Sequence, residues 1–401
     1  MENNWLVASI WMALALLASL ISIRFGLSVA LAEILVGVLG GNAFNLQTVP
    51  WIDFLAGFGA VLLTFLAGAE IDPVSFRENL KSSLVIGIMG FVAPFVGVWL
   101  LSYYMIGWDM RQALIAGIAL STTSVAVVYA VMVETGLNET RLGKLILSAC
   151  FVNDLGTVLA LGIIFANYDI WMIVFIGVLI PVLWLLPKVA PWIISRWGKR
   201  VSEPEIKFFF LILFVLAWLA NKSGSEAVLP AYLIGLVAAG TFVHERAVLQ
   251  RIRSISFAVL TPFYFIKAGM YVSFKALIAG VLLVIIFLAM KMATKFMGVW
   301  PLTRVFKMNK REGNYTTLLM STGLTFGSIS ALFGLTHGII NQSQYTILVT
   351  AVIGSAVVPT LIAQRWFNPV KKKDNMETDA SGSSAAEEKL IVTQSTSDDK
   401  G

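Results

Sequence analysis

Thirteen mostly apolar stretches, each about as long as a bilayer-spanning helix, constrain the fold of this chain more than any other feature of its sequence. A span needs roughly 20 apolar residues, and hydrocarbon admits only backbone whose polar groups are paired internally. The composition, 58% hydrophobic and 13% charged, agrees with this interpretation. The sequence therefore predicts an all-α polytopic membrane protein, with helices at about residues 5–23, 26–44, 51–71, 82–105, 111–134, 142–166, 170–194, 207–221, 227–243, 254–272, 276–303, 314–336 and 344–366.

Lys and Arg are distributed unequally between alternate loops. With thirteen spans, one set of loops holds 21 of these cations and the opposite set holds 3. Cytoplasmic loops are enriched in Lys and Arg, so we expect a multi-pass cell-membrane protein with its N-terminus outside and its C-terminus in the cytoplasm. The formal charge of +6 then reflects topology. No basic surface interleaved with aromatic residues suggests a nucleic-acid partner, which leaves the lipid bilayer as the expected surface contact.

The chain is divided into three parts by its composition. Residues 1–24 are interpreted as an additional N-terminal transmembrane helix, because no Lys or Arg precedes the first apolar stretch and no clear signal-peptide cleavage site follows it. Residues 25–367 form the predicted membrane domain. Residues 368–401 begin with a lysine run and are otherwise rich in Ser, Thr, Asp and Glu, which predicts a disordered cytoplasmic tail.

Six ionisable side chains fall within the predicted spans. Such groups are costly in a membrane and usually face a bundle interior or a water-filled cavity, so together they indicate a polar pathway. Asp154 lies midway along its span, and Glu70 lies near a cytoplasmic end. Glu33 is interpreted as a structural acid that is hydrogen-bonded between helices. Lys267 is expected to brace the outer end of its helix. The remaining two are Lys291 and Lys295.

The chain also contains traces of an internal repeat. Residues 119–129 match residues 323–333 in character at an offset of 204, and residues 65–68 match 265–269 at nearly the same offset. The helices that contain the first pair run in opposite directions under the predicted topology, as in transporters with inverted repeats. Hydroxyl and glycine residues favour a broken helix at 121–124 and at 325–328. The alternative is that they only allow close packing of straight helices.

Four motifs give the chain a resemblance to a known family. They are Asn153-Asp154, Thr122-Thr123-Ser124, the segment from Phe65 to Glu70, and Lys295 followed nine residues later by Arg304. Together they resemble the monovalent cation:proton antiporter superfamily over essentially all thirteen spans. Residues 323–364 are most similar to its second branch, which holds bacterial Na⁺/H⁺ and K⁺/H⁺ antiporters. The chain is too short to include the nucleotide-binding domain of Kef-like relatives.

The resemblance implies roles for particular residues. Asp154 would bind the ion and the proton, two crossed and broken helices would complete the site, and Lys295 would compensate charge nearby. Lys291 lies one turn earlier on the same helix face, so the choice between the two lysines stays open. The resemblance also implies a homodimer, and an elevator motion of a core domain against a dimerisation domain.

One departure from the family pattern affects the expected stoichiometry. Electrogenic relatives commonly have two adjacent aspartates, whereas this chain has Asn153 before Asp154. One fewer titratable group favours electroneutral exchange of one cation for one proton. In two-aspartate relatives the lysine is thought to pair with the missing acid, so Lys295 lacks an obvious partner. Glu70 is a candidate for that partner and for the ion pathway.

Competition at Asp154 provides the expected mechanism. Burial disfavours the bare carboxylate, and either a proton or Na⁺ neutralises it, so the two fluxes are coupled. Hydroxyl or carbonyl oxygens of Thr122, Thr123 and Ser124 are candidate ligands of a hard cation such as Na⁺. The amide oxygen of Asn153 is another, or this side chain only braces the broken helices.

Other functional classes are less consistent with the sequence. An enzyme is not expected, because no catalytic triad, metal-ligand cluster or phosphate-binding loop is found. No cofactor is expected, and the lone cysteine, Cys150, allows no internal disulfide. The transported cation remains open between Na⁺, K⁺ and Li⁺, which keeps a K⁺/H⁺ antiporter as an alternative. An ion channel and a Na⁺-coupled organic-anion symporter are the alternatives from other classes.

Overall fold

The regular secondary structure of the chain is helical throughout its described ranges. The computed structural model describes residues 4–25, 28–44, 46–71, 78–137, 140–165, 170–198, 200–223 and 227–369. The predicted disordered tail lies outside the described residues from position 370 onwards. Within the described part, nine helical stretches are long and apolar enough to cross a membrane, and three shorter apolar helices span Val29–Ala43, Met110–Ser121 and Val228–His244. The prediction of an all-α polytopic membrane protein is confirmed.

Each predicted span coincides with one helix or with a run of consecutive helices. The tenth span corresponds to three pieces, because the polar helix α12 (Arg246–Ile255) passes through a π-helical turn (Ser256–Leu260) into α13 (Thr261–Met270). The helices are α1 (Asn4–Phe25), α2 (Val29–Ala43), α3 (Pro50–Ala69), α5 (Leu80–Leu100), α6 (Met110–Ser121), α7 (Val125–Glu134), α8 (Arg141–Ile164), α9 (Ile170–Trp197), α10 (Pro204–Lys222), α11 (Val228–His244), α12 (Arg246–Ile255), α13 (Thr261–Met270), α14 (Phe274–Val305), α15 (Lys310–Met320), α16 (Thr325–Thr336) and α17 (Gln342–Ile362).

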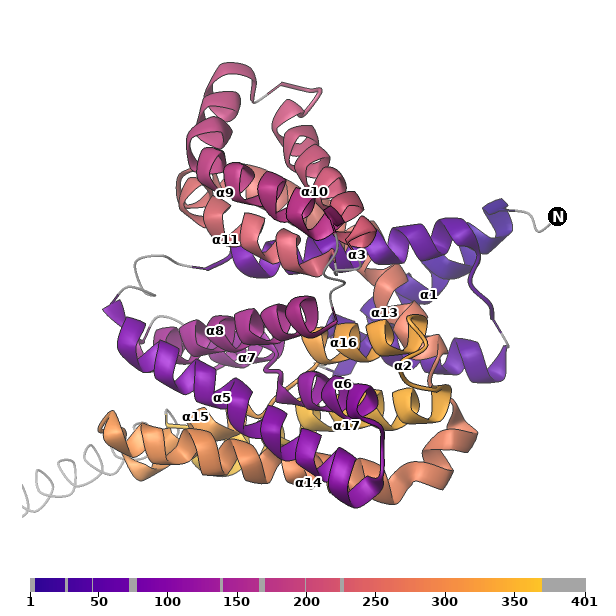
Figure 1. Ribbon diagram of the computed structural model, residues 1–401, viewed down its shortest axis with the longest axis vertical. Helices are drawn as coiled ribbons and strands as arrows, with labels where there is room; N and C mark the ends of the chain where they lie inside the picture. Colours follow the sequence, from indigo (N-terminus) through magenta and orange to yellow (C-terminus); the bar gives the residue numbers. More distant parts are fainter. Residues whose placement is uncertain are drawn as a thin grey trace, which may run out of the picture.

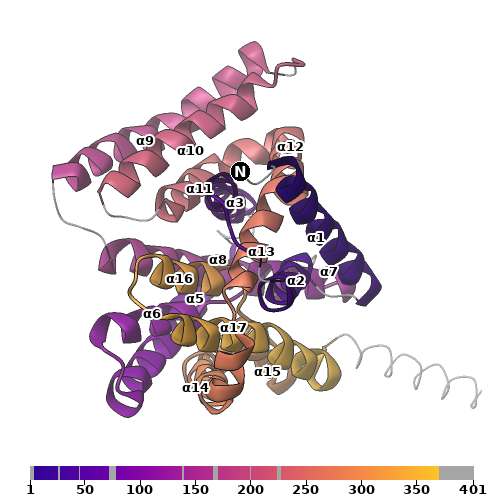
Figure 2. The ribbon, with the colours of Figure 1, turned by 90° about the vertical axis from the view of Figure 1, so that its right-hand side faces the viewer.

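The helices pack into two bundles. Helices α1–α3 and α9–α13 contact one another and form what we call the flanking bundle, while α5–α8 and α14–α17 form the site bundle. In Figures 1 and 2, α9 and α10 lie at one end of the molecule and α14 and α15 at the other. Helix α8 of the site bundle packs against α11 of the flanking bundle between these ends.

Direct backbone contact holds the flanking bundle together. Gly235 of α11 faces α3 so closely that an added Cβ atom would overlap the carbonyl oxygen of Phe65, and a Cβ atom at Gly68 would overlap that of Tyr232. Small residues allow such approach between membrane helices, where van der Waals packing and not hydrophobic burial drives association. The contact between α3 and α11 therefore fixes the position of α11.

Two helices of the site bundle are broken in the middle. The first break, at residues 122–124, separates α6 from α7, and this prediction is confirmed. The second break lies at residues 321–324, between α15 and α16. The predicted position of the second break, 325–328, was wrong, because those residues form the first turn of α16.

The misplaced break follows from the wrong repeat offset. Helices α6 and α15 begin at residues 110 and 310, and α7 and α16 begin at 125 and 325, so both pairs lie 200 residues apart. The expected offset of 204 aligned similar small residues one helical turn too far along. In the structure, the hydroxyls of Ser321 and Thr322 return to the carbonyls of Thr317 and Leu319, which close the end of α15.

Candidate functional site

Asp154 and Asn153 lie at the middle of α8, where the two broken helices cross. Both side chains are buried, with Asp154 only 1% exposed. One carboxylate oxygen of Asp154 and the amide oxygen of Asn153 have no hydrogen-bond partner among the described residues. Buried polar atoms are nearly always paired. Two such oxygens on adjacent residues make this position a candidate ion site.

Asn153 also connects α8 to the first break. Its amide nitrogen donates to the carbonyl oxygen of Ser121, the last residue of α6, at 3.3 Å. Asn153 can therefore act both as a brace and as a candidate cation ligand. Its nitrogen holds the end of α6, and its oxygen has no partner among the described residues.

The predicted residues of the first break are all buried, and two of them tie the breaks together. The hydroxyl of Thr123 donates to the carbonyl of Met320 at 2.8 Å, and the backbone N–H of Ser124 donates to the hydroxyl of Thr322 at 3.4 Å. Thr122 instead donates to Ala119 of its own half-helix at 3.1 Å. Of these three hydroxyl groups, that of Thr123 is the one that donates to the second broken helix, at the last residue of α15.

The two lysines of α14 reach different breaks. The ammonium of Lys295 donates to the hydroxyl of Thr123 at 3.0 Å, and its charge interacts with the carboxylate of Asp154. Lys291 donates to the hydroxyl of Ser355 on α17 at 3.0 Å and packs against Gly323 in the second break. Both lysines are fully buried. Lys295 is therefore held at the first break and is the lysine whose charge acts on Asp154, whereas Lys291 is held at the second break.

Glu70 lies away from this centre. Its carboxylate pairs with Arg253 of α12 at 3.3 Å, and its side chain is 35% exposed. Since the Lys295 ammonium is bonded to Thr123 and is fully buried, the structure does not bring Glu70 and Lys295 together. The substitute partner suggested for Lys295 is therefore not Glu70.

Two other membrane charges can also be placed. Lys267 of α13 pairs with Asp53 of α3 at 2.7 Å, which ties these two helices as a brace would. The expectation that Glu33 is hydrogen-bonded between helices is wrong for its Oε1 atom. This oxygen is buried and accepts no hydrogen bond from the described residues. The nearby contact between α2 and α13 consists instead of close backbone approach at Gly37 and Gly269.

Sequence reasoning missed Ser355, Thr322 and Tyr232. Ser355 had a usable signal, since it is a hydroxyl in an otherwise apolar stretch of α17. Thr322 was missed because the second break was placed one turn too late. Tyr232 resembles any aromatic residue of a membrane span, and only the packing of α11 against α8 places its hydroxyl beside Phe151.

The chain also matches a profile of a known protein family over most of its length. The profile described as sodium/hydrogen exchanger, transmembrane, matches residues 12–368. The chain belongs to the sodium/hydrogen exchanger family. The resemblance to cation:proton antiporters is thus confirmed, and this family consists of transporters rather than enzymes.

Curated relatives match the exchanger over most of their length. A probable Na⁺/H⁺ antiporter 3 of Methanocaldococcus jannaschii is 25% identical over 361 residues, which cover 86% of this chain and 91% of the relative. The Na⁺/H⁺-K⁺ antiporter GerN of Bacillus cereus is 25% identical over 374 residues, which cover 89% of this chain and 94% of GerN.

A solved structure has a similar fold. The sodium proton antiporter MjNhaP1 of Methanocaldococcus jannaschii superimposes with a TM-score of 0.68, covering 90% of this chain and 98% of that one at 14% sequence identity. At this identity the likeness concerns the fold alone.

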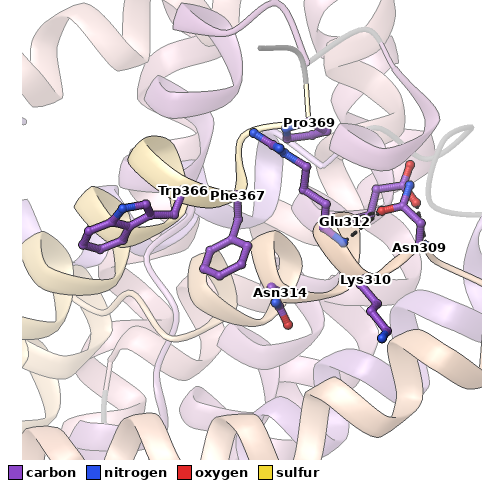
Figure 3. Close-up of a pocket in the computed structure, with 8 residues that line it drawn as sticks. Asn309, Lys310, Glu312, Asn314, Trp366, Phe367 and Pro369 are labelled. Atoms are coloured by element: carbon purple, nitrogen blue, oxygen red, sulfur yellow. Dashed lines mark hydrogen bonds between the residues drawn. The ribbon is translucent and has the colours of Figure 1, made fainter. Parts of the chain in front are cut away.

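A surface pocket of the exchanger lies away from Asp154. It lies at the start of α15, has a volume of about 600 Å³, and is lined by charged, amide and aromatic side chains (Figure 3). The 11 residues of α15 separate this pocket from the second break, which is roughly 16 Å along the helix axis. The pocket is shallow, and its aromatic wall includes the exposed Trp366. It therefore contributes no group to the buried centre.

Proposed function

We propose that this protein exchanges Na⁺ for H⁺ across the cell membrane by alternate binding of the two ions at Asp154. The observation that carries the proposal is the buried carboxylate oxygen of Asp154 that has no partner among the described residues. Burying an ionised carboxylate in a membrane interior costs several kcal/mol even when a lysine offsets part of its charge, so Asp154 takes up a proton or a cation. The family of the chain and the printed activities of its relatives support the same exchange.

The proposed cation site is built from hard oxygen ligands. Asp154 contributes its carboxylate, and Asn153 contributes the amide oxygen that is left open. The hydroxyl of Thr122 keeps free lone pairs, because it donates its proton to Ala119. Thr123 and Ser124 complete the candidate set through their hydroxyl or carbonyl oxygens. Such oxygens suit Na⁺, and no further cofactor takes part.

We further propose that exchange is electroneutral. Asp154 is followed and preceded by uncharged residues, and Lys295 is held by Thr123 in place of a second acid. The carboxylate then carries one Na⁺ in one direction and one proton in the other. Lys295 compensates the charge of the empty carboxylate, while Lys291 stabilises the second break through Ser355.

Alternating access is proposed to follow an elevator motion. The site bundle, which contains Asp154 and both breaks, would slide against the flanking bundle. The flanking bundle would also form the homodimer that the family resemblance implies. The distribution of Lys and Arg supports an outside N-terminus and a cytoplasmic C-terminus.

The test uses purified protein in proteoliposomes with a pH-sensitive dye inside. Pulses of Na⁺, K⁺ and Li⁺ are compared at zero potential and under a clamped potential. We expect a Na⁺ pulse to drive proton flux that does not depend on the potential. Flux with K⁺ in place of Na⁺ would favour the K⁺/H⁺ alternative, for which the name of GerN provides a precedent. If no cation moves protons, exchange is excluded and channel currents or organic-anion uptake become the next measurements.

A further inference from the structure

Two buried tyrosines connect the flanking bundle to the site bundle. Tyr232 of α11 donates its hydroxyl proton to the carbonyl oxygen of Phe151 on α8 at 2.8 Å. Tyr345 of α17 donates to the carbonyl oxygen of Ala268 on α13 at 2.6 Å. Both tyrosines are fully buried. The flanking bundle thus provides the donor of one hydrogen bond, and the site bundle provides the donor of the other.

The backbone of Tyr232 belongs firmly to the flanking bundle. Its carbonyl contacts Gly68 of α3, where a side chain larger than glycine would overlap it. Its ring reaches into the site bundle and packs edge-on against Phe326 of α16, with ring centroids 6.2 Å apart. The acceptor, Phe151, lies about one turn before Asp154 on α8. Tyr232 therefore joins a fixed helix to the helix that holds the ion site.

Tyr345 has the opposite arrangement. Its backbone belongs to α17 of the site bundle, and its ring packs edge-on against Tyr271, which follows α13, with ring centroids 6.3 Å apart. A sliding motion between the bundles has to separate both hydroxyls from their acceptors. Because these groups are buried away from water, a broken bond is not replaced by hydration during the motion.

We propose that Tyr232 and Tyr345 are positioning residues that hold the two bundles in this arrangement and limit the rate at which Asp154 is carried across. This inference rests on the proposed exchange and its sliding motion. Neither hydroxyl is placed among the ion ligands. Their removal should therefore change the rate of exchange without changing the affinity for Na⁺.

The experiment compares Tyr232→Phe, Tyr345→Phe and the double variant with the wild type. The ring is retained in each variant, so packing is preserved and only a hydroxyl is lost. Tyr104→Phe is the matched control, because Tyr104 is 73% exposed. The maximal exchange rate is measured in proteoliposomes, and the Na⁺ dissociation constant is measured separately on detergent-solubilised protein by titration calorimetry.

We expect each single variant to raise the maximal rate by about 3-fold to 10-fold, as the loss of one neutral hydrogen bond from the resting arrangement implies. The double variant should exceed either single variant, and the Na⁺ dissociation constant should stay within about twofold. An unchanged or lowered rate in both folded single variants overturns the inference, while the exchange of the wild type still supports the proposed function. A changed dissociation constant also overturns it, since the tyrosine would then act on the ion site. Absence of exchange in the wild type overturns both proposals.

Discussion

The proposed exchange depends on the difference between two neighbouring side chains. Asp154 and Asn153 each have an oxygen with no partner among the described residues, but only Asp154 can gain and lose a proton. Asn153 contributes a dipole and a brace to Ser121 without adding charge. We therefore expect Asp154 to couple the two ion fluxes and the residue at position 153 to determine their stoichiometry.

Replacement of Asp154 by Asn should abolish exchange. The amide is similar in shape but cannot bind a proton or neutralise Na⁺, so neither half of the cycle remains. Dye-reported proton flux after a Na⁺ pulse measures this. Asp109→Asn is the control, because Asp109 caps α6 at a helix end and Asn caps helices equally well. Cation-driven flux at the wild-type rate in Asp154→Asn would contradict the assignment.

Replacement of Asn153 by Asp should make exchange depend on the membrane potential. A second titratable carboxylate beside Asp154 allows the number of protons to differ from the number of cations. The flux is measured with and without a clamped potential. Asn153→Ala should only slow exchange, because it removes the brace to Ser121 but adds no charge. Potential-independent flux in Asn153→Asp would show that the neighbouring residue does not determine stoichiometry.

The two lysines should differ in what their loss affects. Lys295→Ala removes the charge that acts on Asp154, and we expect the exchange rate to fall by about tenfold or more, because an uncompensated buried charge is strongly unfavourable. Lys291→Ala leaves Ser355 without its donor, which should cost about 1–3 kcal/mol of stability with a smaller loss of rate. Exchange assays and thermal unfolding in detergent separate the two effects. Equal losses of rate in both variants would contradict the distinction.

Among the helices, the two broken pairs are held at their crossing by hydroxyl groups rather than by acids. Thr123 bonds across to Met320, and Ser355 bonds to both Lys291 and the carbonyl of Gly323. The half-helix ends expose backbone dipoles there, and each of the two buried ammonium groups donates to a hydroxyl group at the crossing. The crossing is consequently sensitive to any added volume.

A methyl group at Gly323 should disrupt the crossing. The added Cβ atom would overlap the ammonium of Lys291 and lie 2.9 Å from the hydroxyl of Thr122. We expect Gly323→Ala to lower the exchange rate. It should also lower the free energy of unfolding by about 1–3 kcal/mol, as is typical of an overpacked site. Gly177→Ala in α9 is the control, because nothing lies within 4 Å of its added Cβ atom. A fully active and equally stable Gly323→Ala protein would contradict the described packing.

For the molecule as a whole, the contact between α8 and α11 should be the surface across which the bundles move. Gly162 of α8 and Leu229 of α11 face each other there, with an ideal Cβ atom at Gly162 lying 3.3 Å from that of Leu229. This separation is close to the range of disulfides. The only cysteine of the chain, Cys150, can be replaced by Ala, which leaves two engineered thiols as the only ones.

Oxidation of Gly162→Cys/Leu229→Cys in that background should stop exchange, and a reductant should restore it. The pair Gly156→Cys/Phe91→Cys is a matched control with the same 3.3 Å separation inside the site bundle, and its oxidation should leave its own reduced rate unchanged. Formation of the disulfide is checked by thiol titration. Undiminished exchange in the oxidised α8–α11 protein would exclude sliding at this contact.

The predicted fold, and the predicted position of the first break, were confirmed where the signal is local. Apolar length located all the membrane helices, and the hydroxyl-rich segment 122–124 located the first break. The second break was misplaced because small residues around Gly323 and Gly327 resemble one another closely in the sequence, and only packing selects which of them leaves the helix. Glu70 was considered for the ion pathway because its type and depth are visible in the sequence, whereas its partner, Arg253, is not.

The sequence alone therefore determined that the chain crosses a membrane many times and that an acid lies midway along one helix, since bilayer thickness and the cost of buried charge act on single segments. Only the tertiary structure decided which lysine is held at the first break, which oxygens lack a partner among the described residues, and how the two bundles meet at α8 and α11. These features depend on contacts between segments far apart in the chain. Helix periodicity and composition contain no information about which such segments become neighbours.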